Sequence, residues 1–219
     1  MQYYRISNTR SKKYSPVVGN CYTRYDLREN PNSILKIPAD SFPDFEPDFA
    51  QMNLGEDSEW PDVIDTNSMR ARGFMINSRV RDLLKNFTLP SHRYYPARIY
   101  NPASGEVSHD YHYLQIISHL GDLVNFSESS FYRYHRDSDS REQLQIESFE
   151  VFHELLAEKQ VIDPATLVAQ PHWDMFFMNP FDLVNIYVSQ RLKDDLEKEG
   201  ITGIRLDGKM VNGNHFHFY

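Results

Sequence analysis

The hydrophobic pattern near the C-terminus predicts a strand, a helix and a second strand in that order. Apolar and polar residues alternate over 184–188, as in a half-buried strand. Ser189 then has the chemistry of a helix N-cap, residues 190–199 are rich in helix formers, and Gly200 ends them. A second apolar strand follows at 201–206. A helix of this length can join two parallel strands, so we expect a right-handed βαβ unit.

A second stretch repeats this pattern upstream. When Asn77 is aligned with Ser189, each capping residue follows an apolar residue, Ile76 or Val188. The matched helix positions are Arg79 with Arg191, Val80 with Leu192, Arg81 with Lys193, Asp82 with Asp194 and Leu84 with Leu196. The match favours a duplicated frame of two related strand–helix units, although short amphipathic helices also resemble one another by chance.

The rest of the pattern predicts several further elements. We expect strands at 3–6, 74–76, 94–100, 111–117, 173–178 and 215–219, helices at 80–87 and after Ser148, a helix start at Asp163 and Pro164, a connection at 122–131, and an exposed charged loop at 133–141. Together these elements predict a single α+β domain with a mixed β-sheet and a few packed helices.

Charge is distributed unevenly along the chain. Residues 1–36 have a net charge of +5, and residues 37–69 carry nine acids and no Lys or Arg. Four prolines in 37–69 exclude a long helix, while the aromatic residues between them argue against simple disorder. We therefore expect residues 1–72 to form an N-terminal strand and an irregular region, packed on an α+β main domain of residues 73–219.

The overall composition limits the class of protein. The chain has 219 residues, 40% of them hydrophobic, and a net charge of −8. Such a chain can bury a core, and its charge opposes non-specific binding to nucleic acid or to an anionic membrane. The single cysteine, Cys21, fits a reducing compartment. Because neither an export signal nor a long apolar span is visible, we expect a cytoplasmic protein.

The acidic, aromatic segment 37–69 is the strongest candidate for a binding surface. Its carboxylates would select a cationic partner, and a few desolvated aromatic side chains would supply affinity. The candidate partner-binding residues are Asp44, Phe45, Glu46, Asp48, Phe49, Glu56, Asp57, Glu59, Trp60 and Asp62. The alternative is a solvated acidic loop whose aromatic side chains close over the core.

The sequence contains no assembled catalytic motif. Glycine-rich phosphate loops and a glycine-flanked nucleophilic serine are absent from it. His215 and His217 are spaced so that both imidazoles would share one face of a strand, which makes a metal-dependent hydrolase an alternative function. No partner motif accompanies this pair. We therefore expect no cofactor and no catalytic residue.

Several short motifs resemble those of a bacterial immunity-protein family, long catalogued as a domain of unknown function and found beside polymorphic toxins. The segment Ile186-Tyr-Val-Ser-Gln-Arg-Leu-Lys-Asp-Asp-Leu-Glu-Lys-Glu-Gly-Ile-Thr-Gly-Ile204 looks like the C-terminal signature of that family. The other similar segments are Phe74-Met-Ile-Asn-Ser-Arg-Val-Arg-Asp-Leu-Leu84, the strands at 95–99 and 111–116, and the connection at 123–127. The resemblance covers residues 73–207, so the acidic segment lies outside it.

The resemblance implies a cytoplasmic antitoxin that binds a cognate toxin domain and blocks it by stoichiometric binding. Several toxins associated with the family look like nucleases, whose substrate clefts are basic. An acidic segment would compete with phosphates for such a cleft. An adaptor-type binding module with a different partner is the remaining alternative.

Overall fold

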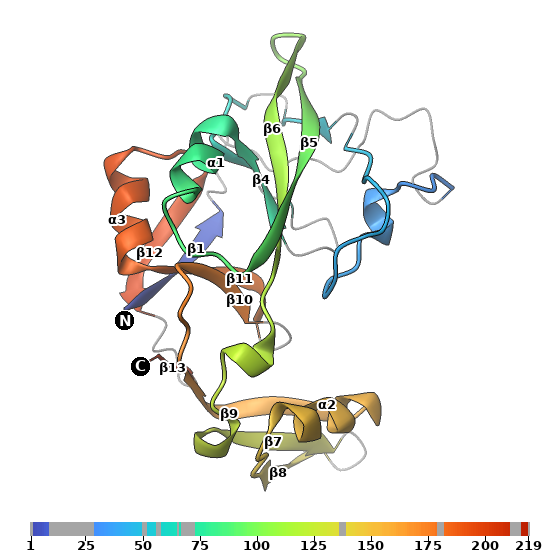
Figure 1. Ribbon diagram of the computed structural model, residues 1–219, viewed down its shortest axis with the longest axis vertical. Coiled ribbons are helices and arrows are strands. Elements are labelled where there is room, and N and C mark those ends of the chain that lie inside the picture. The colour runs from blue at the N-terminus through green and yellow to red at the C-terminus, as the bar shows by residue number, and fades with distance from the viewer. Residues whose placement is uncertain are drawn as a thin grey trace.

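A computed structural model of the chain describes residues 2–8, 29–49, 52–55, 58–64, 66, 73–135, 139–178, 182–210 and 216–218. It has the expected α+β fold, with helices packed on mixed and antiparallel sheets. Figure 1 shows a large upper body and a smaller lower lobe, and the β5–β6 hairpin projects from the upper end.

The first sheet belongs to the middle of the chain and has the strand order β2-β5-β6-β4-β3. Its elements are β2 (Met52–Asn53), β3 (Val63–Ile64), β4 (Gly73–Asn77), the helix α1 (Ser78–Leu84), β5 (Ser91–Asn101) and β6 (Glu106–Ile117). The predicted N-cap is confirmed, because the side-chain oxygen of Asn77 accepts a hydrogen bond from the backbone N–H of Val80.

The second sheet combines the two ends of the chain in the order β10-β11-β1-β12. Its elements are β1 (Tyr3–Asn8), β10 (Met175–Met178), β11 (Asp182–Ser189), the helix α3 (Gln190–Lys198) and β12 (Ile204–Met210). The predicted strand–helix–strand unit is confirmed, and Ser189 caps its helix. The N-terminal strand β1 lies between β11 and β12 and is antiparallel to both, so those two strands run parallel without pairing.

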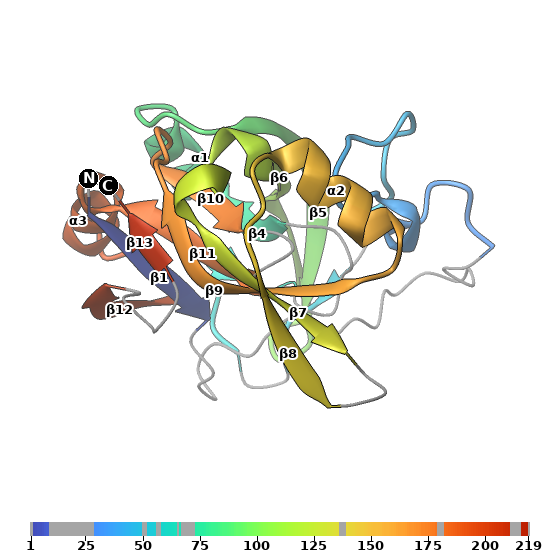
Figure 2. The same cartoon turned by 90° about the horizontal axis from the view of Figure 1, so that it is seen from below.

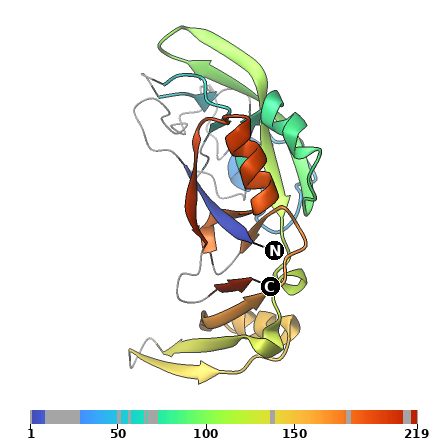
Figure 3. The ribbon, with the colours of Figure 1, turned by 90° about the vertical axis from the view of Figure 1, so that its left-hand side faces the viewer.

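The two sheets repeat the same local structure. Val63 pairs with Ile76 in β3–β4, and the residues aligned with them, Met175 and Val188, pair in β10–β11. The helix α1 follows β4 as α3 follows β11, and Figures 1 and 3 show the two helices side by side. The strand that pairs with the far side of β4 is β6, whereas β1, from the other end of the chain, takes this place beside β11. The second unit therefore repeats the strand arrangement of the first in a circularly permuted order.

An aspartate before β3 connects the two units. The carboxylate of Asp62 accepts hydrogen bonds from Asn77 Nδ2 (2.8 Å) and from the backbone N–H and hydroxyl of Thr202 (2.8 and 2.7 Å). It lies 3.6 Å from Nη1 of Arg79. Asp62 thus binds the N-cap and the first-turn arginine of its own unit, together with the threonine that follows the helix of the other unit.

Asp174 makes the reciprocal contacts before β10. Its carboxylate accepts hydrogen bonds from Ser189 Oγ (2.6 Å), Arg191 Nη2 (2.6 Å) and the backbone N–H of Thr88, which follows α1 (2.8 Å). The two aspartates therefore form a pair of matched clamps, and each one ties the start of one helix to the chain beyond the other. We call these contacts the Asp62 clamp and the Asp174 clamp.

The clamps predict a loss of stability in acid. Burial raises the pKa of each carboxyl, but the hydrogen bonds from Thr202 and Asn77 at Asp62, and from Arg191 and Ser189 at Asp174, outweigh it and hold each pKa below the ordinary value. A carboxyl with a depressed folded-state pKa contributes stability above its unfolded pKa of about 3.9, and that stability disappears as the pH falls through the folded pKa. Thermal midpoints measured from pH 7 to pH 2 should therefore fall steeply below about pH 4.

The Asp174→Asn variant should show a shallower acid decline than the unmodified protein, because it lacks one of the two titrating clamps. Asp194→Asn, an exposed change on α3, is the matched control and should keep the full decline. An Asp174→Asn profile that runs parallel to that of the unmodified protein would contradict this assignment.

Each unit buries both faces of its sheet. One face of each unit meets the other unit in a shared core that includes Val80 and Leu84 of α1 and Leu192 and Leu196 of α3. The acidic segment covers the other face of the first sheet, and the lower lobe covers the other face of the second.

The boundary expected at residue 72 does not separate the sheets. The strands β1, β2 and β3, which precede it, pair with strands from the later part of the chain.

The lower lobe is a third sheet with the strand order β13-β9-β7-β8 and one helix, as Figure 2 shows. Its elements are β7 (Ser130–His135), β8 (Ser140–Leu144), α2 (Phe149–Ala157), β9 (Val161–Ala169) and β13 (Phe216–Phe218). Phe152 of α2 packs on Phe131 of β7, with ring centroids 6.0 Å apart. Ser148 caps α2 as predicted.

Two sequence predictions fail in this lobe. The expected charged loop at 133–141 contributes to β7 and β8, because polar side chains alternate on strands whose outer face is exposed. The expected helix start at Asp163 and Pro164 lies inside β9. Pro164 fits there because β13 pairs only with residues 167–169, so this part of β9 is an edge among the described strands.

Candidate functional site

The acidic segment is a cover for the first sheet, and its aromatic residues divide between core and surface. Phe49 is 2% exposed and stacks on Tyr113 of β6, with centroids 4.8 Å apart. It is therefore a core residue and cannot act as a surface anchor, which corrects the sequence prediction for this position. Trp60 is half-buried and stacks on Tyr111 at 6.1 Å.

The carboxylates of the segment also divide. Asp62 is 8% exposed and belongs to a clamp, so it is a structural group rather than part of an acidic surface. Glu56 and Asp57 lie outside the described residues. The sequence alone did not distinguish Asp62, as a structural residue, from the surface carboxylates near it. Its hydrogen-bond donors, Asn77 and Thr202, are distant from it along the chain.

The remaining candidates lie at the surface. Asp44, Glu46 and Glu59 are exposed, while Phe45 and Asp48 are half-buried. Asp48 accepts a hydrogen bond from Asn30 Nδ2 at 3.2 Å. These five residues are therefore accessible to a partner, as is Trp60 in part, and the predicted binding role stays a prediction.

A groove of about 500 Å³ opens beside Trp60, and we call it the Trp60 groove. It is lined by Trp60, Asn77, Glu106, Val107, Ser108, Asp110 and Tyr111. Most of the lining comes from the first half of β6, which the sequence prediction placed outside the site. Val107 is 45% exposed, which is high for a large apolar side chain. In the sequence, Glu106 precedes Val107 and Asp110 follows it, close to the expected hairpin turn. This pattern was the signal that could have identified the groove.

The chemistry of the Trp60 groove favours a cationic or amphipathic side chain. Its lining combines an indole, an aliphatic side chain and the carboxylates of Glu106 and Asp110, and none of the described residues that line it is a lysine or an arginine. The side chains around it are held in place: Tyr111 donates its hydroxyl hydrogen to the carbonyl of Pro61, and Ser104 Oγ donates to Glu106 at 3.1 Å. Burial raises the pKa of Tyr111 well above its ordinary value, so its hydroxyl stays protonated.

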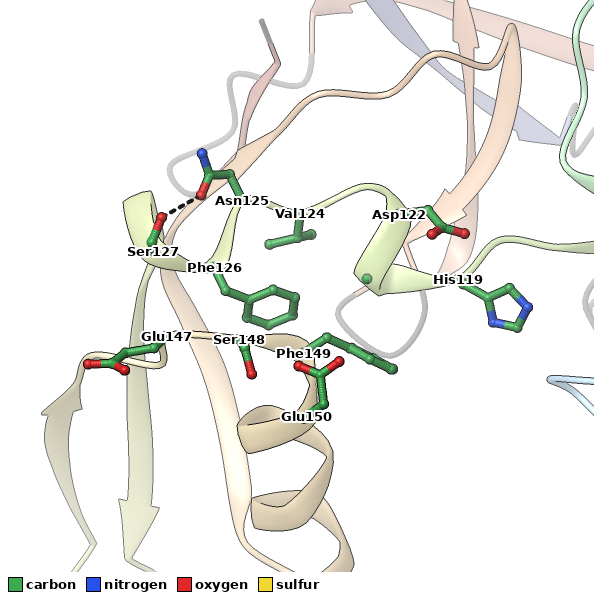
Figure 4. Close-up of a pocket in the computed structure, with 11 residues that line it drawn as sticks. His119, Asp122, Val124, Asn125, Phe126, Ser127, Glu147, Ser148, Phe149 and Glu150 are labelled. Atoms are coloured by element: carbon green, nitrogen blue, oxygen red, sulfur yellow. Dashed lines mark hydrogen bonds between the residues drawn. The ribbon is translucent and has the colours of Figure 1, made fainter.

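A second hollow, of about 490 Å³, lies at the start of α2. Figure 4 shows the rings of Phe126 and Phe149 facing it, with the Glu150 carboxylate close to Phe149. The hydroxyls that line it serve local structure, because Ser148 caps α2 and Ser127 donates to Asn125 Oδ1 at 2.8 Å. This hollow therefore offers an aromatic floor and exposed carboxylates, and the hydroxyl of Ser148 also hydrogen-bonds to the carboxylate of Glu150, which lowers the pKa of Glu150.

The described residues do not assemble a metal site. No group of three or more histidine, cysteine or acidic side chains within the described ranges is placed to hold a metal ion. His215 and Cys21 lie outside these ranges, and for His217 the structure describes the backbone of β13 alone. The predicted histidine pair is therefore not tested.

Comparison with known proteins does not assign the chain. No model of a known protein family matches the sequence, and no curated protein matches it. Among the described residues, no helix is both long and apolar enough to cross a membrane.

Proposed function

We propose that this protein is an immunity protein that neutralises a cognate bacterial toxin domain by stoichiometric binding. The motifs at 74–84 and 186–204 support the proposal, since they form the two strand–helix units on which the body of the protein is built. In this proposal the protein acts in the cytoplasm, has no cofactor and contacts neither nucleic acid nor membrane directly.

The observation that carries the proposal is the Trp60 groove with its carboxylates. A half-buried tryptophan in a hollow is the kind of anchor that supplies much of the affinity of a protein interface, and charged residues at the rim select the partner and speed encounter. Glu106 and Asp110 line the groove, and Glu59 directly precedes Trp60 in the chain, so several carboxylates accompany the tryptophan. A toxin domain with a basic nucleic-acid cleft has the complementary charge.

Neutral variants of the groove test the proposal directly. The triple variant Glu59→Gln, Glu106→Gln, Asp110→Asn should raise the Kd for the toxin domain about tenfold or more, which corresponds to about 1.4 kcal/mol. The loss should come mainly from slower association and should shrink at high salt, because salt screens the attraction. The Kd and the association rate constant can both be measured by surface plasmon resonance at several salt concentrations.

The second hollow supplies a matched control. The triple variant Asp122→Asn, Glu147→Gln, Glu150→Gln removes the same charge from the lower lobe. It should change the Kd by less than about threefold. Equal effects of the two triple variants would show that total charge, rather than the Trp60 groove, controls binding, and the proposed site would then be wrong.

A further inference from the structure

In the described part of the chain, the start of β6 has no strand partner on one edge, beside the Trp60 groove, where only Ser78 Oγ reaches a backbone carbonyl, that of Asp110 at 3.4 Å. Its ladder with β4 spans residues 111–115 and ends at the pair Asn77↔Tyr111, where the chain turns into α1. Residues 106–108 pair with β5 on the opposite side. No described strand lies along the other edge of residues 106–110.

The backbone polar groups of Val107 point toward this edge. On the outer side of β5, the carbonyl of Tyr100 accepts a hydrogen bond from the N–H of Leu54 at 2.8 Å. In an antiparallel ladder the N–H and C=O of one residue point to the same side, so Tyr100 forms a non-hydrogen-bonded pair with the residue opposite it, and the polar groups of both residues point outward from the ladder. Since Val107 is opposite Tyr100, its N–H and C=O face the edge that β4 does not reach.

A register shift explains why the edge opens here. Tyr111 is opposite Ala97 and Ser108 is opposite Ile99, so β6 has one residue more than β5 between these pairs. Such a bulge reverses which residues bond to each side and bends the strand. The residues of β6 that precede the bulge belong to the projecting β5–β6 hairpin of Figure 1.

We propose that the partner adds an extended strand to this edge of β6, and that this strand carries basic and apolar side chains. The inference rests on the proposed binding function and specifies how the partner is held. Val107 would donate its N–H to the added strand and accept a hydrogen bond at its carbonyl, as in other cases of strand addition. Apolar side chains would pack against Trp60 and Val107, while basic side chains would reach Glu106 and Asp110.

Charge favours such a segment over a second copy of this chain. Self-pairing would bring the carboxylates of Glu106 and Asp110 close to their copies, and the whole chain has a net charge of −8. Like charges brought together at an interface oppose association. A basic extended segment instead neutralises the carboxylates that line the groove.

A pair of blocked peptides tests the inference on the full-length protein. Arg-Val-Arg-Val-Arg has the proposed chemistry, and Arg-Pro-Arg-Pro-Arg has the same charge but lacks the alternate N–H groups that a strand ladder requires. The measured quantity is the rate of amide hydrogen exchange at Val107, which NMR spectra of the ¹⁵N-labelled protein report. We expect the first peptide at saturation to slow exchange about tenfold or more and the second to leave it unchanged.

Three results would overturn the inference. They are equal effects of the two peptides, no binding of Arg-Val-Arg-Val-Arg at millimolar concentration, and protection of Val107 that rises with protein concentration alone, which would assign the edge to a dimer. Variants of Val107 add an independent readout. Val107→Pro removes the outward N–H and should weaken binding of the peptide about tenfold, while Val107→Thr keeps the N–H and should change it less than about threefold.

The failure of this inference can be distinguished from the failure of the proposed function. If the toxin domain binds and depends on Glu106 and Asp110, but Val107→Pro does not weaken it, strand addition is wrong and the binding function stands. If no toxin domain binds the protein, the proposed function fails, whatever the peptides show.

Discussion

Replacing Asp174 with alanine is expected to lower the free energy of unfolding by about 2 to 4 kcal/mol, because it leaves buried hydrogen-bond donors without their acceptor. The residue Asp174 is 5% exposed, and its carboxylate accepts three hydrogen bonds, from Ser189, Arg191 and the backbone of Thr88. Its loss leaves the backbone N–H of Thr88 without this acceptor and removes the ion pair with Arg191. Because the contacts join the start of α3 to the chain after α1, the variant should unfold the two units together at lower denaturant concentration.

Chemical denaturation, followed by far-ultraviolet circular dichroism, measures this effect. Asp194→Ala is a suitable control, since its side chain is 57% exposed on α3 and takes no part in either clamp. It should change stability by less than about 0.5 kcal/mol. An Asp174→Ala variant within about 1 kcal/mol of the unmodified protein would show that the clamps do not hold the units together.

The Gly203→Ala substitution is expected to destabilise the protein by about 3 kcal/mol or more. Gly203 has a φ of +87°, a conformation that L side chains rarely adopt. A Cβ atom there would lie 1.9 Å from the carbonyl oxygen of Val63, which belongs to the other unit. This oxygen cannot easily move, because the N–H of Val63 donates to the carbonyl of Thr202 at 3.1 Å.

The Gly105→Ala variant separates backbone strain from this contact. Gly105, in the turn between β5 and β6, has a φ of +74° and no atom within 4 Å of an added Cβ. Its replacement should cost only the conformational penalty, about 1 kcal/mol. Equal thermal shifts for the two variants would indicate that the close approach to Val63 does not constrain the units.

Local patterns predicted the two strand–helix units well. The signals were short-range: alternating apolar residues, a capping side chain and a glycine after α3, which has a φ of +61°. The insertion of β1 between β11 and β12 was not predictable in this way. It joins the two ends of the chain, and the sequence carries no local mark of such a pairing.

The candidate site was predictable only in part, for a related reason. Net charge identified the acidic segment, but charge alone does not distinguish a surface carboxylate such as Glu46 from a clamp residue such as Asp62. Most of the lining of the Trp60 groove comes from the first half of β6. This part of β6 is accessible because β4 ends beside Tyr111. A register of this kind is set by tertiary pairing and is not visible in the alternation along one strand.

The most direct test of the binding function is affinity purification of the tagged protein from its own cells, followed by identification and quantification of every protein recovered with it. We expect one toxin domain at a 1:1 ratio, with a basic surface, whose activity stops when the purified protein is added. Recovery of the protein alone, together with a tightly bound metal ion, would contradict the proposed binding function and favour the metal-dependent alternative.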